Sequence, residues 1–293
     1  MRSFKFGHRR YGNVLVLGAP YSYVYLLGST LIDTGTGYWG KRILRFLREE
    51  GISVRRVLFT HSHYDHVGGY TYVREIGEHT TGAHPRFYEV MSKERVIRFI
   101  EEMNRKEMLL LKDGEAENYR FLPPAEGEVL EDGVRLGWEK GEIEVIHTPG
   151  HTRDSVSYYV LPERIMVVGE AAGVPNSAGT YILPQFLTSV IDYLNSLRRL
   201  REYDVELLGL PHVMLIEGKR EVRRYLSLSE AATRRYVEDL KRIYEGCGGE
   251  WECIKERVME EIYRKNSLDQ PEYAFLANLK AQIRALERDF YSL

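Results

Sequence analysis

The sequence predicts an α+β fold for residues 1–216 and an all-helical domain for residues 217–293. Two observations predict this division. Strand-like and helical hydrophobic patterns alternate through the first part, whereas three or four amphipathic helices, and no convincing strand, follow Glu217. The second part also contains 15 basic and 15 acidic residues, a balance typical of solvated helix faces.

The first domain is expected to begin with short strands and a helix. Apolar runs punctuated by Gly and Pro predict strands at Asn13–Leu17, Val24–Leu27 and Thr30–Ile32. Apolar residues at helical spacing then predict a helix over Gly40–Glu49. The apolar run Val54–Phe59 predicts a buried strand, and a helix is expected to begin near Val67.

The remainder of the first domain continues this alternation. A long pattern rich in Met, Leu and charged residues predicts a helix over Phe87–Leu111, ended by Lys112-Asp113-Gly114. A later helix is expected at Phe186–Leu200. Further strands are predicted at Val129–Leu136, Glu142–Ile146, Ser155–Leu161, Arg164–Val168 and Val205–Leu210.

Charge and hydropathy argue against two classes of partner. The formal net charge of −2 offers no bulk attraction to nucleic acid or to anionic membranes. No apolar run approaches the roughly 20 residues of a membrane span, and the N-terminal residues MRSFKFGHRRYG lack an apolar signal core. We therefore expect a cytoplasmic protein that has no membrane partner and that acts on a small molecule rather than on nucleic acid.

The chain has two cysteines, Cys247 and Cys253. Two thiols are too few for a disulfide framework or for a structural zinc site of their own. We expect reduced thiols in a connection between helices. A disulfide that closes this short loop is the alternative, and the abundance of Arg, Glu and Lys, which fits a thermophile, leaves it open.

One short stretch, THSHYDHVGG, concentrates side chains that bind metals. It contains His61, His63, Asp65 and His66 directly after a predicted buried strand. Alternate residues of an extended segment point the same way, so the first two histidines can converge on one ion. The other two residues are then turned toward a second ion, about 3.5–4 Å away in two-metal sites. The glycine pair that ends the stretch is expected to let the backbone turn sharply into the next helix without obstruction by a side chain.

Further ligands are expected at the ends of later strands, because one cluster cannot complete two metal spheres. His151 lies in the sequence HTPGHT after one predicted strand. Glu170 and His212 each follow another. His147 precedes the same motif as His151 but is expected to support the site rather than to bind metal.

This spread of motifs resembles the metallo-β-lactamase superfamily, and most closely its glyoxalase II-like hydrolases. The resemblance rests on the HxHxDH motif of His61–His66, on the TPGHT motif of Thr148–Thr152, on Glu170 and on the Pro211-His212 pair. It implies a four-layer αββα sandwich for residues 1–216 and a C-terminal helical domain.

The resemblance also implies a role for each ligand. The first metal would be held by His61, His63 and His151, and the second by Asp65, His66 and His212. Glu170 would lie between the two metals. The usual residue at this position in the family is aspartate, so the longer side chain is a departure that could change how the metals are bridged. The residues that hold glutathione in glyoxalase II are not recognisable here, which lowers the expectation of a glutathione thioester.

The implied activity is metal-dependent hydrolysis. Two divalent ions, zinc with iron or manganese as alternatives, are expected to share a hydroxide that attacks an electrophilic carbonyl. Asp65 is the expected catalytic residue, because it could orient the nucleophile and pass its proton to the leaving group. The segments Phe87–Leu111 and Gly173–Pro184 carry apolar side chains that could wall a pocket. The expected partner is therefore a small thioester, ester or lactone, and a homodimer is left open.

Three other interpretations stay open. A metal-dependent phosphodiesterase or nuclease would use the same site, and the basic run Arg198-Arg199-Leu200-Arg201 keeps this interpretation open. A metal-binding effector with little turnover is compatible with the unusual Glu170. Redox chemistry at an iron-loaded site is the third.

Overall fold

The computed structural model describes residues 6–19, 22–124 and 126–291, which form two compact units. Unit 1 comprises Met1–His147 and Asp154–Gly169. Unit 2 comprises Thr148–Arg153 and Glu170–Leu293. The predicted division into residues 1–216 and 217–293 follows the change from strands to helices, and it stays a prediction.

Unit 1 contains a seven-stranded mixed sheet in the order β1-β2-β3-β4-β5-β6-β7. Pairing is antiparallel from β1 to β4 and parallel from β4 to β7. Parallel strands end at the same edge of a sheet, so the residues that follow β4, β5 and β6 are brought to one edge. The strands are Gly7–Tyr11, Val14–Ala19, Ser22–Leu27, Thr30–Ile32, Arg56–Leu58, Thr80–Ala83 and Glu128–Val129.

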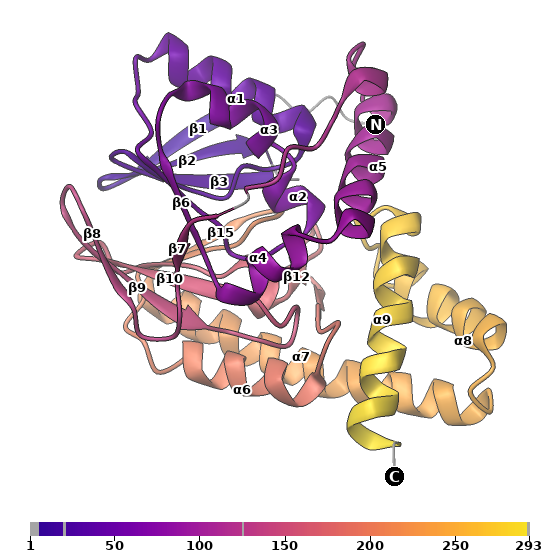
Figure 1. Ribbon diagram of the computed structural model, residues 1–293. Helices are drawn as coiled ribbons and strands as arrows, with labels where there is room; N and C mark the ends of the chain where they lie inside the picture. Colours follow the sequence, from indigo (N-terminus) through magenta and orange to yellow (C-terminus); the bar gives the residue numbers. More distant parts are fainter. Residues whose placement is uncertain (1–5, 20–21, 125, 292–293) are drawn as a thin grey trace. The chain divides into compact units, whose positions relative to one another are not determined.

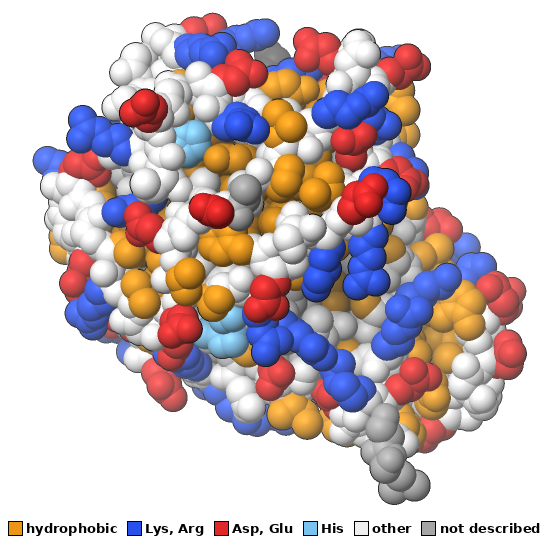
Figure 2. Space-filling view, in the orientation of Figure 1, with side chains coloured by type: hydrophobic (Ala, Val, Ile, Leu, Met, Phe, Trp, Pro, Cys, Tyr) orange, Lys and Arg blue, Asp and Glu red, His pale blue; other side chains and the backbone are white. Residues whose placement is uncertain are grey.

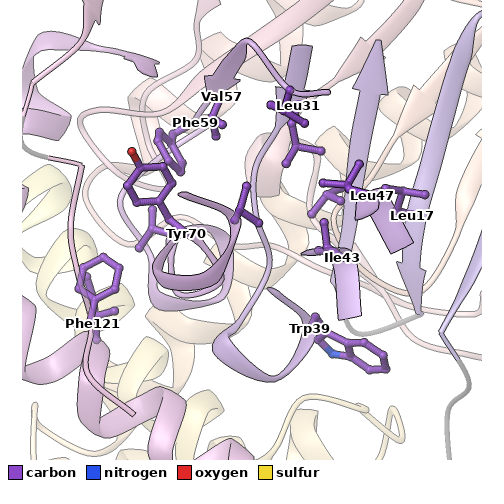
Figure 3. Close-up of a cluster of buried hydrophobic side chains, with 14 of the residues drawn as sticks. Leu17, Leu31, Trp39, Ile43, Leu47, Val57, Phe59, Tyr70 and Phe121 are labelled. Carbon is purple, nitrogen blue, oxygen red and sulfur yellow. The ribbon is translucent and has the colours of Figure 1, made fainter. Parts of the chain in front are cut away.

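Helices pack on this sheet through a buried apolar core (Figures 1 and 3). Ile43, Leu44 and Leu47 of α1 are all buried, as their spacing predicts. Phe59, directly after β5, stacks on Phe87 with ring centroids 5.0 Å apart. The helices of unit 1 are α1 (Gly37–Glu49), α2 (Tyr64–Val67), α3 (Tyr70–Val73), α4 (Pro85–Met91) and α5 (Glu94–Leu110), with 3₁₀ turns at Arg74–Ile76 and Ala116–Asn118.

A second, antiparallel set of strands completes unit 1. Strands β8 (Arg135–Trp138), β9 (Gly141–His147), β10 (Val156–Leu161) and β11 (Ile165–Val167) pair in chain order. Strand β10 is tied to the chain that follows β5: the Tyr158 hydroxyl donates to the Phe59 carbonyl at 2.7 Å, and the Val156 N–H donates to the Thr60 carbonyl at 2.8 Å. These bonds fix the backbone just ahead of the histidine cluster.

Unit 2 is mainly helical. It contains two short antiparallel strand pairs, β12 (Val174–Pro175) with β13 (Ile182–Leu183), and β14 (Leu207–Gly209) with β15 (Leu215–Glu217). Its helices are α6 (Val190–Leu200), α7 (Lys219–Gly246), α8 (Trp251–Val258) and α9 (Glu272–Phe290), with a π-helical turn at Met259–Arg264.

Several predicted element bounds are wrong, each for a local reason. The single helix predicted over Phe87–Leu111 is two helices, α4 and α5, because the helix is interrupted at Ser92 and Lys93. The strand predicted over Val129–Leu136 is split between β7 and β8, which belong to different sheets. The helix predicted from Phe186 begins at Val190, since the Ser189 hydroxyl caps it by accepting from the Asp192 N–H.

The two cysteines form a disulfide between Cys247 and Cys253. The expectation of reduced thiols is therefore wrong, and the loop-closing alternative describes this structure. Gly248 and Gly249 have positive φ angles of 59° and 77° and reverse the chain between α7 and α8. This turn brings the two Cα atoms to 5.7 Å, within the range that a disulfide requires.

The surface is of mixed charge. Figure 2 shows basic and acidic side chains interspersed over most of the visible face, in keeping with the net charge of −2. Every helix in the described part of the chain is too short or too polar to cross a membrane. The cytoplasmic location stays a prediction.

Candidate metal centre

The histidine cluster lies in unit 1, at the carboxyl end of β5. The His61 ring centroid is 4.6 Å from that of His63 and 4.1 Å from that of His66. A ring nitrogen of His61 lies within 4.8 Å of one of His63, and a ring nitrogen of His66 lies within 4.8 Å of an Asp65 carboxylate oxygen. His61 and His66 are buried, whereas His63 and Asp65 are partly exposed. Imidazoles and a carboxylate gathered this closely are the ligand types that zinc prefers.

Asp33, which the sequence motifs did not reveal, organises this cluster from the end of β4. One carboxylate oxygen accepts from the Thr60 N–H at 2.8 Å. The other lies 2.8 Å from both the Thr60 hydroxyl and Nδ1 of His66. An imidazole that donates through Nδ1 keeps Nε2 available to a metal. Its position in the sequence could have indicated its role, because Asp33 follows a predicted strand just as the predicted ligands do.

The glycine pair after the cluster lies where the backbone passes from α2 to α3. Gly68 and Gly69 have ordinary negative φ angles of −58° and −68°, so this passage requires their lack of a side chain and no unusual backbone conformation. A Cβ atom on Gly69 would lie 2.0 Å from the Thr34 carbonyl oxygen and 2.8 Å from the Gly40 Cα. The missing side chain lets the cluster's backbone approach α1.

Unit 2 provides the other three predicted ligands and brings them together. One carboxylate oxygen of Glu170 lies 3.1 Å from Nε2 of His212, and the other lies 3.5 Å from Nε2 of His151. His151 is 2% exposed and Glu170 is 5% exposed. The carboxylate therefore faces two imidazoles at once, and the longer side chain of glutamate reaches both of them.

The ring of His151 is held by the backbone. Its Nδ1 donates to the Gln185 carbonyl at 2.5 Å, which leaves Nε2 directed to Glu170. Gly150, just before it, has a positive φ of 124°, and a Cβ there would lie 2.4 Å from the backbone of Tyr193. The Gly150 carbonyl in turn accepts from the N–H groups of residues 187, 188 and 189. Only glycine fits this turn, which sets the position of His151.

The remaining histidines have other contacts. His84 caps α4, accepting from the Arg86 N–H at 3.2 Å, and its ring stacks on His147 with centroids 4.5 Å apart. Partial burial, and then the charge of His147, lower the pKa of His84. His79 contacts the Tyr70 hydroxyl at 3.2 Å, and the ring of His8 lies against a phenylalanine ring.

Some residues expected to wall a substrate pocket are core residues instead. Phe87 is fully buried and Met91 is 2% exposed, and both belong to the apolar core of unit 1. Both side chains are enclosed by that core and therefore cannot contact a substrate. Phe99 is 52% exposed, so the outer face of α5 keeps an apolar side chain at the surface.

Acidification is expected to destabilise the fold through His84. Because the folded state holds the pKa of His84 below its unfolded value of about 6.5, the unfolded state takes up the proton more readily. The stability that the fold gains by keeping His84 uncharged is complete above a pH of about 6.5. It falls as the pH decreases below that value. The free energy of unfolding of the wild type should drop more between pH 7.5 and pH 5.5 than that of His84→Asn, whose side chain can still cap α4. An equal drop would show that His84 does not control this pH dependence.

Known proteins of one family resemble this chain. A sequence profile of the metallo-beta-lactamase superfamily matches residues 17–212. The lactamase-like protein nscB of Neosartorya fischeri is 27% identical over 156 residues, covering 50% of this chain and 36% of that protein. An atrochrysone carboxyl ACP thioesterase of Aspergillus fumigatus is 22% identical over 227 residues, covering 75% of this chain and 59% of that protein. The chain thus spans about a third and about three fifths of these two relatives.

A solved structure of similar fold covers nearly the whole chain. A metallo-beta-lactamase family protein of Thermus thermophilus superposes with a TM-score of 0.63 at 21% identity, covering 98% of this chain and 93% of that one. With the sequence match, this likeness confirms the predicted α+β sandwich fold and the helical C-terminal region of α7 to α9.

Proposed function

The chain belongs to the metallo-beta-lactamase superfamily, and on this premise we propose that it is a metal-dependent hydrolase of small thioesters, esters or lactones. The observation that carries the proposal is the position of the Glu170 carboxylate, 3.1 Å and 3.5 Å from Nε2 of His212 and His151. These histidines are the ligands predicted for different metals. A carboxylate that faces both is suited to lie between two ions.

The donor set fits two divalent ions, with zinc proposed and iron or manganese as alternatives. We propose that Glu170 is shared by both ions. His66 and His151 each have Nδ1 engaged by an acceptor, which presents Nε2 as the ligand atom. The proposed ligands of the first ion are His61, His63 and His151, and those of the second are Asp65, His66 and His212.

The proposed reaction adds water across an acyl bond. Divalent ions, when bound, would lower the pKa of water toward neutrality and polarise the substrate carbonyl. Asp65, on α2 beside His66, is proposed to take the proton from the attacking water and to return it to the departing thiolate or alkoxide. The products are a carboxylic acid and a thiol or alcohol.

A thioester is the substrate class that we favour. The relative named as an ACP thioesterase matches 75% of this chain, which supports acyl transfer from sulfur to water as a chemistry for this scaffold. The glyoxalase II-like subgroup and the homodimer stay predictions. The net charge of −2, and the interspersed charges on the face shown in Figure 2, favour a small molecule over a nucleic acid as the partner.

A substrate panel tests the activity. The zinc-loaded protein is given a short-chain acyl thioester, an aryl ester, a lactone and a phosphodiester, and kcat/KM is measured for each. We expect the thioester to be the best substrate and the phosphodiester to be poor. Preferred cleavage of the phosphodiester would overturn the proposal in favour of a phosphodiesterase, and no turnover of any substrate by metal-loaded protein would favour the effector interpretation.

A further inference from the structure

Helix α9, near the C-terminus, turns one polar face toward the segment of residues 184–191 in the same unit (yellow in Figure 1). Three residues of this face contact the segment: Asn278, Gln282 and Asp289. Their spacing of four and seven residues places them within about 40° of one another around a helix of 3.6 residues per turn. The rest of the buried surface of α9 is mainly apolar, and one further contact with the segment, from the Arg288 guanidinium to the Thr188 carbonyl, comes from outside this face.

Each of the three side chains holds a different part of the segment. The Gln282 side-chain amide donates to the Pro184 carbonyl at 2.9 Å. The Asn278 amide donates to the Gln185 side-chain oxygen at 3.2 Å. Asp289 caps α6, accepting from the Val190 N–H at 2.7 Å and from the Ser189 hydroxyl at 3.0 Å.

Gln282 is the most enclosed member of this face. It is 2% exposed, and its amide oxygen accepts from the Tyr236 hydroxyl of α7 at 2.7 Å. Its amide hydrogen-bonds on both sides, once to α7 and once to the segment. Buried polar groups that are satisfied in this way hold a single arrangement, because any shift leaves a polar atom unpaired.

The segment that α9 holds is the one that orients His151. The carbonyl of Gln185, next to Pro184, accepts from Nδ1 of His151 at 2.5 Å. The Gln185 N–H donates to the Tyr193 hydroxyl at 3.3 Å, and that hydroxyl donates to the Glu170 carbonyl at 2.9 Å. A displacement of residues 184 and 185 would therefore move the acceptor of one proposed ligand and loosen a backbone contact of another.

We propose that the polar face of α9 is a positioning device for the metal centre, and that Gln282 is its principal positioning residue. The C-terminal helix acts on His151 and Glu170 through residues 184 and 185, without contacting metal or substrate. The inference rests on the proposed metal centre. It assigns to the helical region a role in metal affinity, separate from any role in substrate choice.

Zinc binding by the full-length protein tests this role. Gln282→Met keeps the side-chain volume and removes both hydrogen bonds, and Asn278→Ala removes one bond at a partly exposed site. Arg284→Met is the matched control, because it introduces the same residue at an exposed position of α9. Zinc affinity is measured by competition with a chromophoric chelator, and the visible spectrum of the cobalt-loaded protein reports ligand geometry.

We expect Gln282→Met to weaken zinc binding about 10-fold, the lower end of the effect of residues that orient metal ligands. Its cobalt spectrum should change, Asn278→Ala should show a smaller shift in the same direction, and Arg284→Met should match the wild type. A purely structural role would lower the melting temperature but leave affinity and spectrum unchanged, and this result would overturn the inference. If Gln282→Met does not fold, unchanged zinc affinity in Asn278→Ala overturns it. A wild type that binds no zinc would instead overturn the proposed function.

Discussion

Replacing Glu170 by glutamine is expected to lower kcat/KM for thioester hydrolysis by about 100-fold, the upper end of the effect of losing a residue that supports a metal ligand, with loss of one zinc ion per chain. Both carboxylate oxygens face an imidazole Nε2, at 3.1 Å and 3.5 Å. Glutamine keeps the reach of the side chain but removes the charge and turns one oxygen into an N–H donor. That donor would face a ligand nitrogen instead of sharing a metal with it.

Glu170→Asp is the matched control for this prediction. It keeps the charge but withdraws the carboxylate by one methylene, more than an ångström, from the two histidines. We expect the aspartate variant to bind two zinc ions more weakly than the wild type and to retain more activity than the glutamine variant. The test of the bridging role is metal content from elemental analysis, with kcat/KM measured on the same samples. A glutamine variant with wild-type zinc content would contradict the bridging role.

Replacing Asp33 by asparagine is expected to weaken zinc binding about 10- to 100-fold, the usual effect of losing a residue that orients a metal ligand. Three donors converge on the Asp33 carboxylate: the Thr60 N–H, the Thr60 hydroxyl and Nδ1 of His66. Asparagine has the same shape but only one oxygen. If that oxygen still accepts from the Thr60 N–H, the amide NH₂ faces Nδ1 of His66. It then favours the His66 tautomer that carries its proton on Nε2.

The control for Asp33→Asn is Asp113→Asn, the same change in the same unit. Asp113 accepts from Lys41 at 2.7 Å, at some distance in sequence from every predicted ligand. Its variant should bind zinc as the wild type does. Competition with a chelator gives the affinities, and circular dichroism verifies the fold. Wild-type zinc affinity in Asp33→Asn would show that His66 needs no such partner.

The candidate ligands could be chosen from sequence because their residue types are rare and densely placed, and their binding of metal stays a prediction. Histidines in THSHYDHVGG and donors after later strands stand out without any knowledge of packing. The parallel pairing of β4 and β5 then explains why Asp33 and Thr60 meet at one sheet edge, although 27 positions separate them.

The supporting contacts could not be predicted in the same way. Gln185 holds His151 through its backbone carbonyl, which any residue type provides. Gln282 donates to the carbonyl of the preceding residue, Pro184, from 98 positions further along the chain. Nothing in the sequence around Gln282 indicates this contact. The apolar side chain of Phe87 suits either a pocket wall or a core, and only the packing places it in the core.

The most direct test of the account is metal content and hydrolysis measured on one preparation. The purified protein is analysed for zinc, iron and manganese, assayed with an acyl thioester, stripped with a chelator, assayed again and reloaded with each metal. We expect two metal ions per chain, loss of hydrolysis on stripping and its recovery on reloading. Hydrolysis that persists at full rate in metal-free protein would contradict the account.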